Sequence, residues 1–318
     1  MRITVIGGSG HIGTWLVPML AQEGYEVICV SRGIREPYQA HAAWQEIRPV
    51  HLDRAACEAA GNFGNSIAAL DAECVIDLTC FTPASAAHLV EALRGRVGHF
   101  LHCGTIWVHG HSVEIPTTEE APRAPFGNYG IRKLAIETYL MEQASTGFPA
   151  TVLHPGHIVG PGWTPINPAG NLNLDVFQRL LAGLEVILPN QGMETLHHVH
   201  AADVAVAFAQ AVKRREDAVG HSFHVVSPAA LTMREYAERI AWWAGREPIL
   251  AFLPWEEWRA RHSETDARIT WDHLAHSPNC SIGKARELLG YQPRYSSLEA
   301  VEEALEWLIA NGRLRKEE

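Results

Sequence analysis

Short apolar runs and amphipathic stretches alternate along the first half of the chain. Residues 2–6 form an apolar run rich in β-branched side chains, residues 14–23 carry apolar positions at helical spacing, and residues 25–30 form a second apolar run. This pattern predicts a buried strand, a helix and a second buried strand. Because strands and helices continue to alternate to about residue 160, we expect an α/β fold with a doubly wound parallel sheet.

The pattern becomes less regular in the second half. Residues 161–168 are rich in Pro and Gly and are predicted to form a loop. A short strand is expected at 222–226, and helices are expected at 172–184, 201–212, 233–244 and 299–311. Thr232 should cap the helix at 233–244 with Glu235 in its first turn, and Gly312 should end the final helix.

Three glycines, Gly7, Gly10 and Gly13, separate the first strand from the first helix. Gly7 allows a tight turn, Gly10 lets the backbone approach a pyrophosphate, and Gly13 lets the helix pack closely on the strand. The N-terminus of the helix adds amide groups and a favourable dipole for phosphate. A plain Gly-rich loop is the alternative, but a strand–turn–helix–strand unit of about 30 residues favours a dinucleotide site.

The end of the second strand indicates which dinucleotide binds. An NAD site usually has a carboxylate there for the ribose 2′-hydroxyl, whereas this chain has Ser31, Arg32 and Gly33. Arg32 could pair with a 2′-phosphate through its planar guanidinium, although it could also be a solvated Arg at a strand end. The sequence therefore favours NADP over NAD.

Tyr129 and Lys133 lie four residues apart and would share one face of a helix. A free Tyr has a pKa of about 10, and a nearby ammonium favours the phenolate. Lys133 is therefore expected to lower the pKa of Tyr129 toward the range useful for acid–base catalysis. By itself the pair could be a surface Tyr beside an unrelated Lys, and it is the glycine turn that favours the catalytic interpretation.

Composition narrows the class of protein. The chain has 318 residues, 47% apolar residues and a net charge of −10, which fits a large globular core and argues against a general nucleic-acid binder. No apolar run approaches the 18 residues expected of a membrane span, and no signal-peptide layout precedes the first strand. The six Cys are scattered, as expected of free thiols in a reducing cytoplasm.

The chain contains 18 His, so a metal site has to be considered. Some of these residues cluster, but none forms a His-Glu-x-x-His motif or another tight ligand spacing. We therefore expect no functional metal. His109 and His157 lie on loops near the expected reaction centre and are candidate substrate ligands, the alternative being ordinary surface or hydrogen-bonded histidines. His200 is expected to be structural.

Together these motifs resemble the extended epimerase/dehydratase branch of the short-chain dehydrogenase/reductase superfamily. The resemblance covers nearly the whole chain. Its landmarks are the glycine turn, 73–79 and 100–105 as the fourth and fifth strands, Thr105, Tyr129, Lys133, 152–162, 200–205 and 284–293.

The resemblance implies a Rossmann-type doubly wound parallel sheet with a smaller C-terminal substrate-binding lobe. Residues 1–160 would form the dinucleotide-binding domain, and 161–318 would form mainly the substrate lobe, with some segments returning to the first domain. It also implies catalytic roles for Tyr129, Lys133 and Thr105. The implied cofactor contacts are Gly7, Gly10, His11, Ile12, Gly13, Ser31, Arg32, Asp53, Leu78, Thr79, Cys80, Lys133 and Pro155.

The function implied is an NAD(P)-dependent oxidoreductase of the epimerase/dehydratase type, with Tyr129 as acid/base and a sugar or nucleotide-sugar-like small molecule as substrate. Leu196 replaces an Arg that grips the diphosphate in such epimerases, and Arg268 is displaced from a second such position. The alternatives are an NADPH-dependent carbonyl reductase of a non-sugar substrate and a non-catalytic dinucleotide-binding scaffold. The resemblance also implies a homodimer, although apolar residues on the Tyr129 helix are equally explained by core packing.

Overall fold

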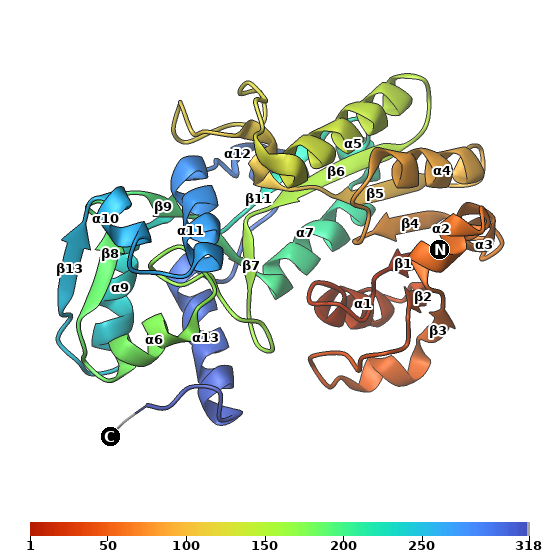
Figure 1. The fold of residues 1–318 in the computed structure, drawn as a ribbon. Helices are drawn as coiled ribbons and strands as arrows, with labels where there is room; N and C mark the ends of the chain where they lie inside the picture. The colour runs from red at the N-terminus through yellow and green to blue at the C-terminus, as the bar shows by residue number, and fades with distance from the viewer. Residues whose placement is uncertain (317–318) are drawn as a thin grey trace.

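A parallel β-sheet with helices on both faces forms the larger part of the molecule (Figure 1). The computed structural model describes residues 1–316. Within the sheet every neighbouring pair is parallel. In spatial order the seven strands are β11 (Ser222–Val225), β6 (Ala150–Pro155), β5 (His99–Cys103), β4 (Cys74–Asp77), β1 (Arg2–Ile6), β2 (Glu26–Ser31) and β3 (Arg48–His51).

The order of the strands creates a crevice at the carboxyl end of β1. The chain runs outward from β1 through β2 to β3 and then returns to β4 on the other side of β1. Ile6 pairs with Val30 on one side and with Asp77 on the other, so these strands end at one edge. Open parallel sheets bind ligands where the strand order reverses, which here is immediately above the glycine turn.

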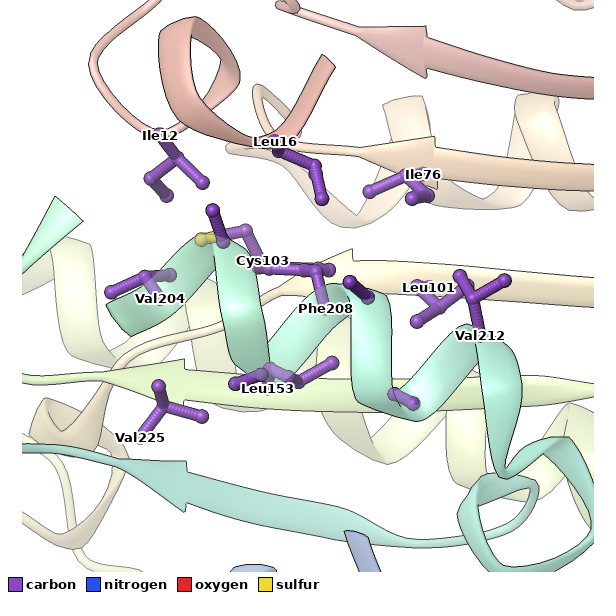
Figure 2. Close-up of a cluster of buried hydrophobic side chains, with 14 of the residues drawn as sticks. Ile12, Leu16, Ile76, Leu101, Cys103, Leu153, Val204, Phe208, Val212 and Val225 are labelled. Atoms are coloured by element: carbon purple, nitrogen blue, oxygen red, sulfur yellow. The ribbon is translucent and has the colours of Figure 1, made fainter. Parts of the chain in front are cut away.

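Alternate residues of the central strands face two separate cores. Ile3 and Val5 face α1 and α7, whereas Ile6 and Val75 face α4 and α5. Figure 2 shows Val204, Phe208 and Val212 of α7 packed against the sheet. The helices of this part are α1 (Gly13–Gln22), α2 (Arg54–Ala59), α3 (Phe63–Ala68), α4 (Pro83–Leu93), α5 (Gly127–Ser145), α7 (Ala201–Lys213), α8 (Arg215–Ala218) and α12 (Gly283–Leu289). Short 3₁₀ turns cover Ala42–Glu46 and Ile106–His109.

A second apolar core lies under the C-terminal elements, on the left in Figure 1. Its helices are α6 (Leu174–Leu181), α9 (Met233–Trp243), α10 (Trp255–Arg259), α11 (Glu264–His276) and α13 (Ser297–Ala310). Its strands form the pairs β8 (Val186–Pro189) with β13 (Leu250–Leu253), and β9 (Thr195–Leu196) with β12 (Leu231–Thr232). A further pair, β7 (His157–Val159) with β10 (His198–His200), contacts α7 on one side and α13 on the other.

The elements predicted from hydrophobic spacing are present with small shifts at their ends. Thr232 caps α9 and accepts a hydrogen bond from the Glu235 amide, as predicted. The last helix begins at Ser297 rather than residue 299, because Ser296 and Glu299 form a reciprocal capping box. Asn311 caps its other end, and Gly312 follows with a φ of +68°. The predicted domain division at residue 160 stays a prediction, with α7 and β11 returning to the sheet.

Two observations concern membrane-spanning helices and assembly. In the described part of the chain, no helix is long and apolar enough to cross a membrane. On α5, Ile136 and Leu140 are fully buried in the core of the same chain, while Ile131 is 51% exposed. Core packing thus accounts for two of the apolar residues on this helix, and the homodimer stays a prediction.

Candidate active site

The glycine turn at residues 7–13 requires glycine at its first and last positions. Gly7 has a φ of +83°, and a Cβ atom there would lie 2.4 Å from Cγ2 of Thr79. A Cβ atom on Gly13 would lie 2.2 Å from the carbonyl oxygen of Gly8. The Gly7 amide donates to the Val30 carbonyl at 2.8 Å, which ties the turn to β2. The turn therefore places bare backbone and the start of α1 at the crevice, as phosphate binding requires.

A cavity of about 580 Å³ opens beside this turn. This volume is within the range of small-molecule sites. Of the residues predicted to contact the cofactor, those in its lining are Gly7, Gly10, Ser31, Arg32, Asp53 and Thr79. Lining residues that the sequence did not single out include Arg35, Tyr38, Arg54, Phe81, Thr82 and Ser85. The cavity thus joins the glycine turn to the ends of β2, β3 and β4, where a dinucleotide would fit.

The remaining predicted cofactor residues lie outside the lining of this cavity. His11 stacks on Trp163 with ring centroids 4.8 Å apart and meets the edge of Tyr38. Asp53, in contrast, does line the cavity. It also caps α2, where its carboxylate accepts the Ala56 amide at 3.0 Å. Ile12 and Gly13 belong to the glycine turn, Leu78 and Cys80 follow β4, Pro155 ends β6, and Lys133 lies on α5.

A buried ion pair lies at the cavity wall. Arg54 donates through Nη1 to both oxygens of Asp77, at 2.8 and 2.9 Å, and through Nε to Glu58 at 2.7 Å. Asp77 is fully buried and also accepts the Thr79 amide at 3.0 Å. Although burial alone lowers the pKa of Arg54, the attraction of Asp77 outweighs it and raises that pKa above its ordinary value. The ion pair holds the loop that follows β4 against α2.

Replacing Asp77 by Ala should lower the free energy of unfolding by about 3–5 kcal/mol, because Arg54 would keep a buried charge without its main partner. Urea unfolding followed by circular dichroism measures this change. The matched control is Glu142→Ala, an exposed carboxylate on α5, which should stay within about 0.5 kcal/mol of the wild type. A loss below about 1 kcal/mol for Asp77→Ala would contradict this account of the wall.

The three predicted catalytic residues gather at the ends of β4 and β5. Tyr129 and Lys133 lie one turn apart on α5, and Thr105 follows β5. The Thr105 side chain neighbours the Tyr129 hydroxyl and favours its ionised form, which acts to lower the pKa of Tyr129. Thr105 Oγ1 also accepts the Trp107 amide at 3.3 Å. Lys133 is buried, and its Nζ donates to the carbonyl oxygens of Cys80 at 2.8 Å and Cys103 at 2.7 Å.

The expected lowering of the Tyr129 pKa is absent from this structure. Although the Tyr129 side chain is 44% exposed, desolvation of its hydroxyl, with Cys103 nearby, raises the pKa of Tyr129 to about 12, and Thr105 only partly opposes the rise. Lys133 is not among the groups that shift this pKa, and its ammonium donates to two backbone carbonyls. Burial also lowers the pKa of Lys133. Tyr129 therefore keeps its proton near neutral pH, which suits a proton donor.

Aromatic rings and histidines surround the space beside Tyr129. Trp107 stacks on His276 at a centroid distance of 4.1 Å, and its edge-on neighbours are Tyr129 at 6.0 Å and His157 at 6.2 Å. His157 in turn lies 4.8 Å from His273. Both nitrogens of His157 and Nε2 of His276 are buried without a hydrogen-bond partner. Buried polar atoms of this kind normally bind water or a ligand.

These histidines are uncharged at neutral pH. Burial lowers the pKa of His157 well below its ordinary value and lowers the pKa of His273 and of His276 to about 4. A neutral imidazole offers one donor and one acceptor, which matches hydroxyl and carbonyl groups. Only His157 of this group was singled out from the sequence. His273 and His276 come from α11, more than 100 residues away, and no local motif marks them.

His109, the other predicted substrate ligand, lies in a different environment. It is buried, its Nε2 lies 2.8 Å from Nε2 of His224, and its Nδ1 faces the Pro122 carbonyl oxygen at 3.4 Å. Both nitrogens already have neighbours within the protein, so the structure gives His109 no free group for a substrate.

Within residues 1–316, no cluster of His, Cys, Asp or Glu has the geometry of a metal site.

The two positions that differ from diphosphate-binding relatives are also clear in the structure. Leu196 is fully buried in the C-terminal core, on the strand β9. Arg268 is exposed on α11. Leu196 therefore fills a core position and cannot hold a phosphate, which requires a charged or hydrogen-bonding side chain.

The parallel sheet, the glycine turn and the cavity at the strand reversal define a Rossmann-type NAD(P)-dependent oxidoreductase. The family model described as the NAD dependent epimerase/dehydratase family matches residues 3–225, and the chain belongs to that family.

Known relatives include both reductases and epimerases. The chain is 29% identical to 2'-dehydrokanamycin reductase from Streptomyces kanamyceticus, over 99% of this chain and 86% of that protein. It is 25% identical to UDP-glucose 4-epimerase from Streptomyces lividans, over 96% and 95% of the two chains. The solved structure of UDP-glucose 4-epimerase from Thermotoga maritima with UDP-glucose has a TM-score of 0.75 and 22% identity, over 98% and 99% of the two chains. These relatives establish an NAD(P)-dependent enzyme.

Proposed function

We propose that the protein is an NADPH-dependent reductase of a ketone on a sugar-like ring that carries no phosphate. The observation that carries the proposal is the neighbouring pair of Thr105 and Tyr129, in which Tyr129 stays protonated, beside a wall of uncharged histidines. A protonated Tyr is ready to donate to a carbonyl oxygen, whereas oxidation of an alcohol would require the phenolate.

In this mechanism NADPH, when bound, supplies the hydride that reduces the carbonyl carbon. Thr105 donates a hydrogen bond to the carbonyl oxygen and orients the ketone. Tyr129 gives its proton to the same oxygen as the C–O double bond becomes a single bond, so the products are an alcohol and NADP⁺. Lys133 would hold the cofactor ribose. The Thr105 hydroxyl stabilises the phenolate left on Tyr129, which then takes a proton from water.

This direction of reaction predicts a particular pH profile. Reduction needs the protonated phenol, and the raised pKa of Tyr129, about 12, lies above the ordinary value of about 10. We therefore expect kcat/KM for reduction to show no Tyr129-dependent fall from about pH 7 to about pH 9. The measurement is a pH–rate series with NADPH and ketone. A basic limb in this range, traced to deprotonation of Tyr129, would mean that its pKa is depressed after all.

Two arginines favour NADPH over NADH. Arg32 and Arg35 both line the cavity next to Ser31 at the end of β2, and the strand ends without a carboxylate. Arg35 Nη1 donates to the Tyr38 hydroxyl at 3.2 Å, which holds this side chain over the cavity. Two guanidinium groups and a hydroxyl form a suitable site for a ribose 2′-phosphate.

Replacing Arg32 or Arg35 by Ala should weaken NADPH binding by about tenfold or more, the loss expected for one charge-assisted hydrogen bond, and leave NADH binding nearly unchanged. Fluorescence titration of both cofactors measures the two dissociation constants. Arg48→Ala is the matched control, because Arg48 is exposed on β3 and outside the cavity lining. Equal losses for NADPH and NADH would count against a 2′-phosphate site.

The substrate class follows from the uncharged wall and from a relative. His157 and His276 can hydrogen-bond hydroxyl groups, and Leu196 offers nothing to a phosphate. The reductase from Streptomyces kanamyceticus acts, by its name, on 2'-dehydrokanamycin, which we propose as the kind of substrate for this chain. The test is NADPH consumption with 2'-dehydrokanamycin and with a panel of ketones, beside UDP-glucose.

A second candidate is a nucleotide-sugar epimerase, supported by the similarity to UDP-glucose 4-epimerases over nearly the full chain. Such an enzyme would convert UDP-glucose without net consumption of cofactor. Product formation from UDP-glucose at a constant level of reduced cofactor would favour this candidate. No turnover of any substrate, with cofactor binding intact, would instead favour the non-catalytic scaffold.

A further inference from the structure

We propose that His154 and Glu137 are positioning residues, which hold Thr105 in the geometry that lets its hydroxyl serve Tyr129 and the substrate. This inference rests on the proposed function, because it assigns Thr105 a part in the reaction. His154 lies on β6 and contacts Thr105 directly, whereas Glu137 lies on α5 and contacts His154.

The first contact fixes the backbone of Thr105. The Thr105 amide donates to Nδ1 of His154 at 2.9 Å, and this bond is buried. An accepting Nδ1 carries no hydrogen, so a neutral His154 must carry its hydrogen on Nε2. Nε2 lies 3.1 Å from Oε1 of Glu137. The Glu137 carboxylate therefore favours the tautomer with hydrogen on Nε2. This tautomer leaves Nδ1 free to accept the Thr105 amide.

The second contact fixes the carboxylate. Although burial alone raises the pKa of Glu137, His154 and Arg123 outweigh it and hold that pKa far below its ordinary value. Arg123 donates to the two oxygens of Glu137 from Nη2 at 2.7 Å and from Nε at 3.1 Å. Its Nη1 also donates to the Glu119 carbonyl at 2.6 Å. Glu137 is therefore ionised, and Arg123 holds it with Oε1 facing Nε2 of His154 at 3.1 Å.

A glycine at residue 104 allows His154 to approach the backbone beside Thr105. A Cβ atom on Gly104 would lie 2.4 Å from Nδ1 of His154, so only glycine before Thr105 allows the close approach. Glu137 also follows Lys133 by four residues and Tyr129 by eight, on the same face of α5. One helix face therefore sets the position of Tyr129 directly and the position of Thr105 through His154.

The consequence concerns the Thr105 hydroxyl. Its oxygen accepts the Trp107 amide, so its own hydrogen remains to be donated. With the amide of Thr105 fixed by His154, this O–H keeps its direction toward Tyr129. If the backbone were released, small errors in position would reduce the rate strongly, since a displacement of about 1 Å can cost roughly 100-fold.

The variants His154→Leu and His154→Asn test the inference. Leu removes the acceptor, whereas the Asn amide oxygen can take the place of Nδ1. We expect His154→Leu to lower kcat by about 10- to 100-fold while KM and the dissociation constant for NADPH stay unchanged, and His154→Asn to restore most of the rate. Equal loss in the two variants, or a loss that appears mainly in NADPH binding, would overturn the proposal and leave His154 a core residue.

A double-mutant cycle with Thr105→Ala separates action through Thr105 from general damage. If His154 acts through the Thr105 hydroxyl, His154→Leu should have little further effect on kcat in the Thr105→Ala background. Additive effects would overturn the proposal. The double-mutant cycle measures the rate of ketone reduction. If the wild-type enzyme showed no turnover, the proposed function itself would be contradicted.

Nitrogen-15 NMR of the histidine rings in the whole protein tests the same geometry without turnover. We expect His154 to carry hydrogen on Nε2 and a hydrogen-bonded, unprotonated Nδ1. In Glu137→Gln, the loss of the carboxylate should shift the Nε2 resonance. Hydrogen on Nδ1 of the wild type, or no response to Glu137→Gln, would overturn the proposal even where the reaction itself is established.

Discussion

Tyr129→Phe lowers kcat for ketone reduction by about 10²- to 10⁴-fold, the usual contribution of a positioned proton donor. The substitution removes one oxygen and keeps the ring whose edge meets Trp107 at 6.0 Å. Since the cavity lining does not include Tyr129, the dissociation constant for NADPH should not change. Steady-state kinetics and a cofactor titration on the same samples measure both quantities.

The matched control is Tyr139→Phe, ten residues further along α5. Tyr139 packs against the core on the sheet's α4–α5 side, and the loss of its hydroxyl should leave kcat within about twofold of the wild type. A Tyr129→Phe enzyme that reduced the ketone at the wild-type rate would show that another group supplies the proton.

Gly13→Ala should nearly abolish NADPH binding and destabilise the fold by at least about 1–3 kcal/mol. The added Cβ atom would lie 2.2 Å from the carbonyl oxygen and 2.4 Å from the carbonyl carbon of Gly8. These atoms belong to the backbone of the phosphate-facing turn, so they cannot move without opening the turn itself. Urea unfolding and NADPH titration measure the two effects.

Gly98→Ala provides the comparison, because the nearest atom to its added Cβ is the Glu73 carbonyl oxygen at an ordinary 3.5 Å. Its stability and its NADPH affinity should be close to those of the wild type. If Gly13→Ala behaved in the same way as Gly98→Ala, the close contact between α1 and the turn would not be needed for the dinucleotide site.

The sequence predicts well those parts of the structure that depend only on residues close together in the chain. Gly7 and Gly13 precede a helix and follow an apolar strand, so their geometry follows from a few neighbouring residues. The capping of α9 by Thr232 is likewise a contact over three residues. The spacing of Tyr129 and Lys133 was sufficient to place both on one helix face.

The parts that failed depend on distant segments. Lys133 was expected to lower the pKa of Tyr129, but its ammonium is bound to carbonyls at the ends of β4 and β5, which only the folded sheet brings to it. Trp107 and His276 lie 169 positions apart and stack directly. No periodicity or spacing connects such residues, so the uncharged wall beside Tyr129 could only be found in three dimensions.

The central claim is that this enzyme reduces a ketone with NADPH and uses Tyr129 as the proton donor. The most direct measurement follows NADPH absorbance and product formation together, for the wild type and for Tyr129→Phe. We expect the wild type to consume NADPH and form alcohol in equal amounts, and Tyr129→Phe to bind NADPH but form almost no alcohol. Product formed with no net loss of NADPH, or at an unchanged rate in Tyr129→Phe, would contradict the account.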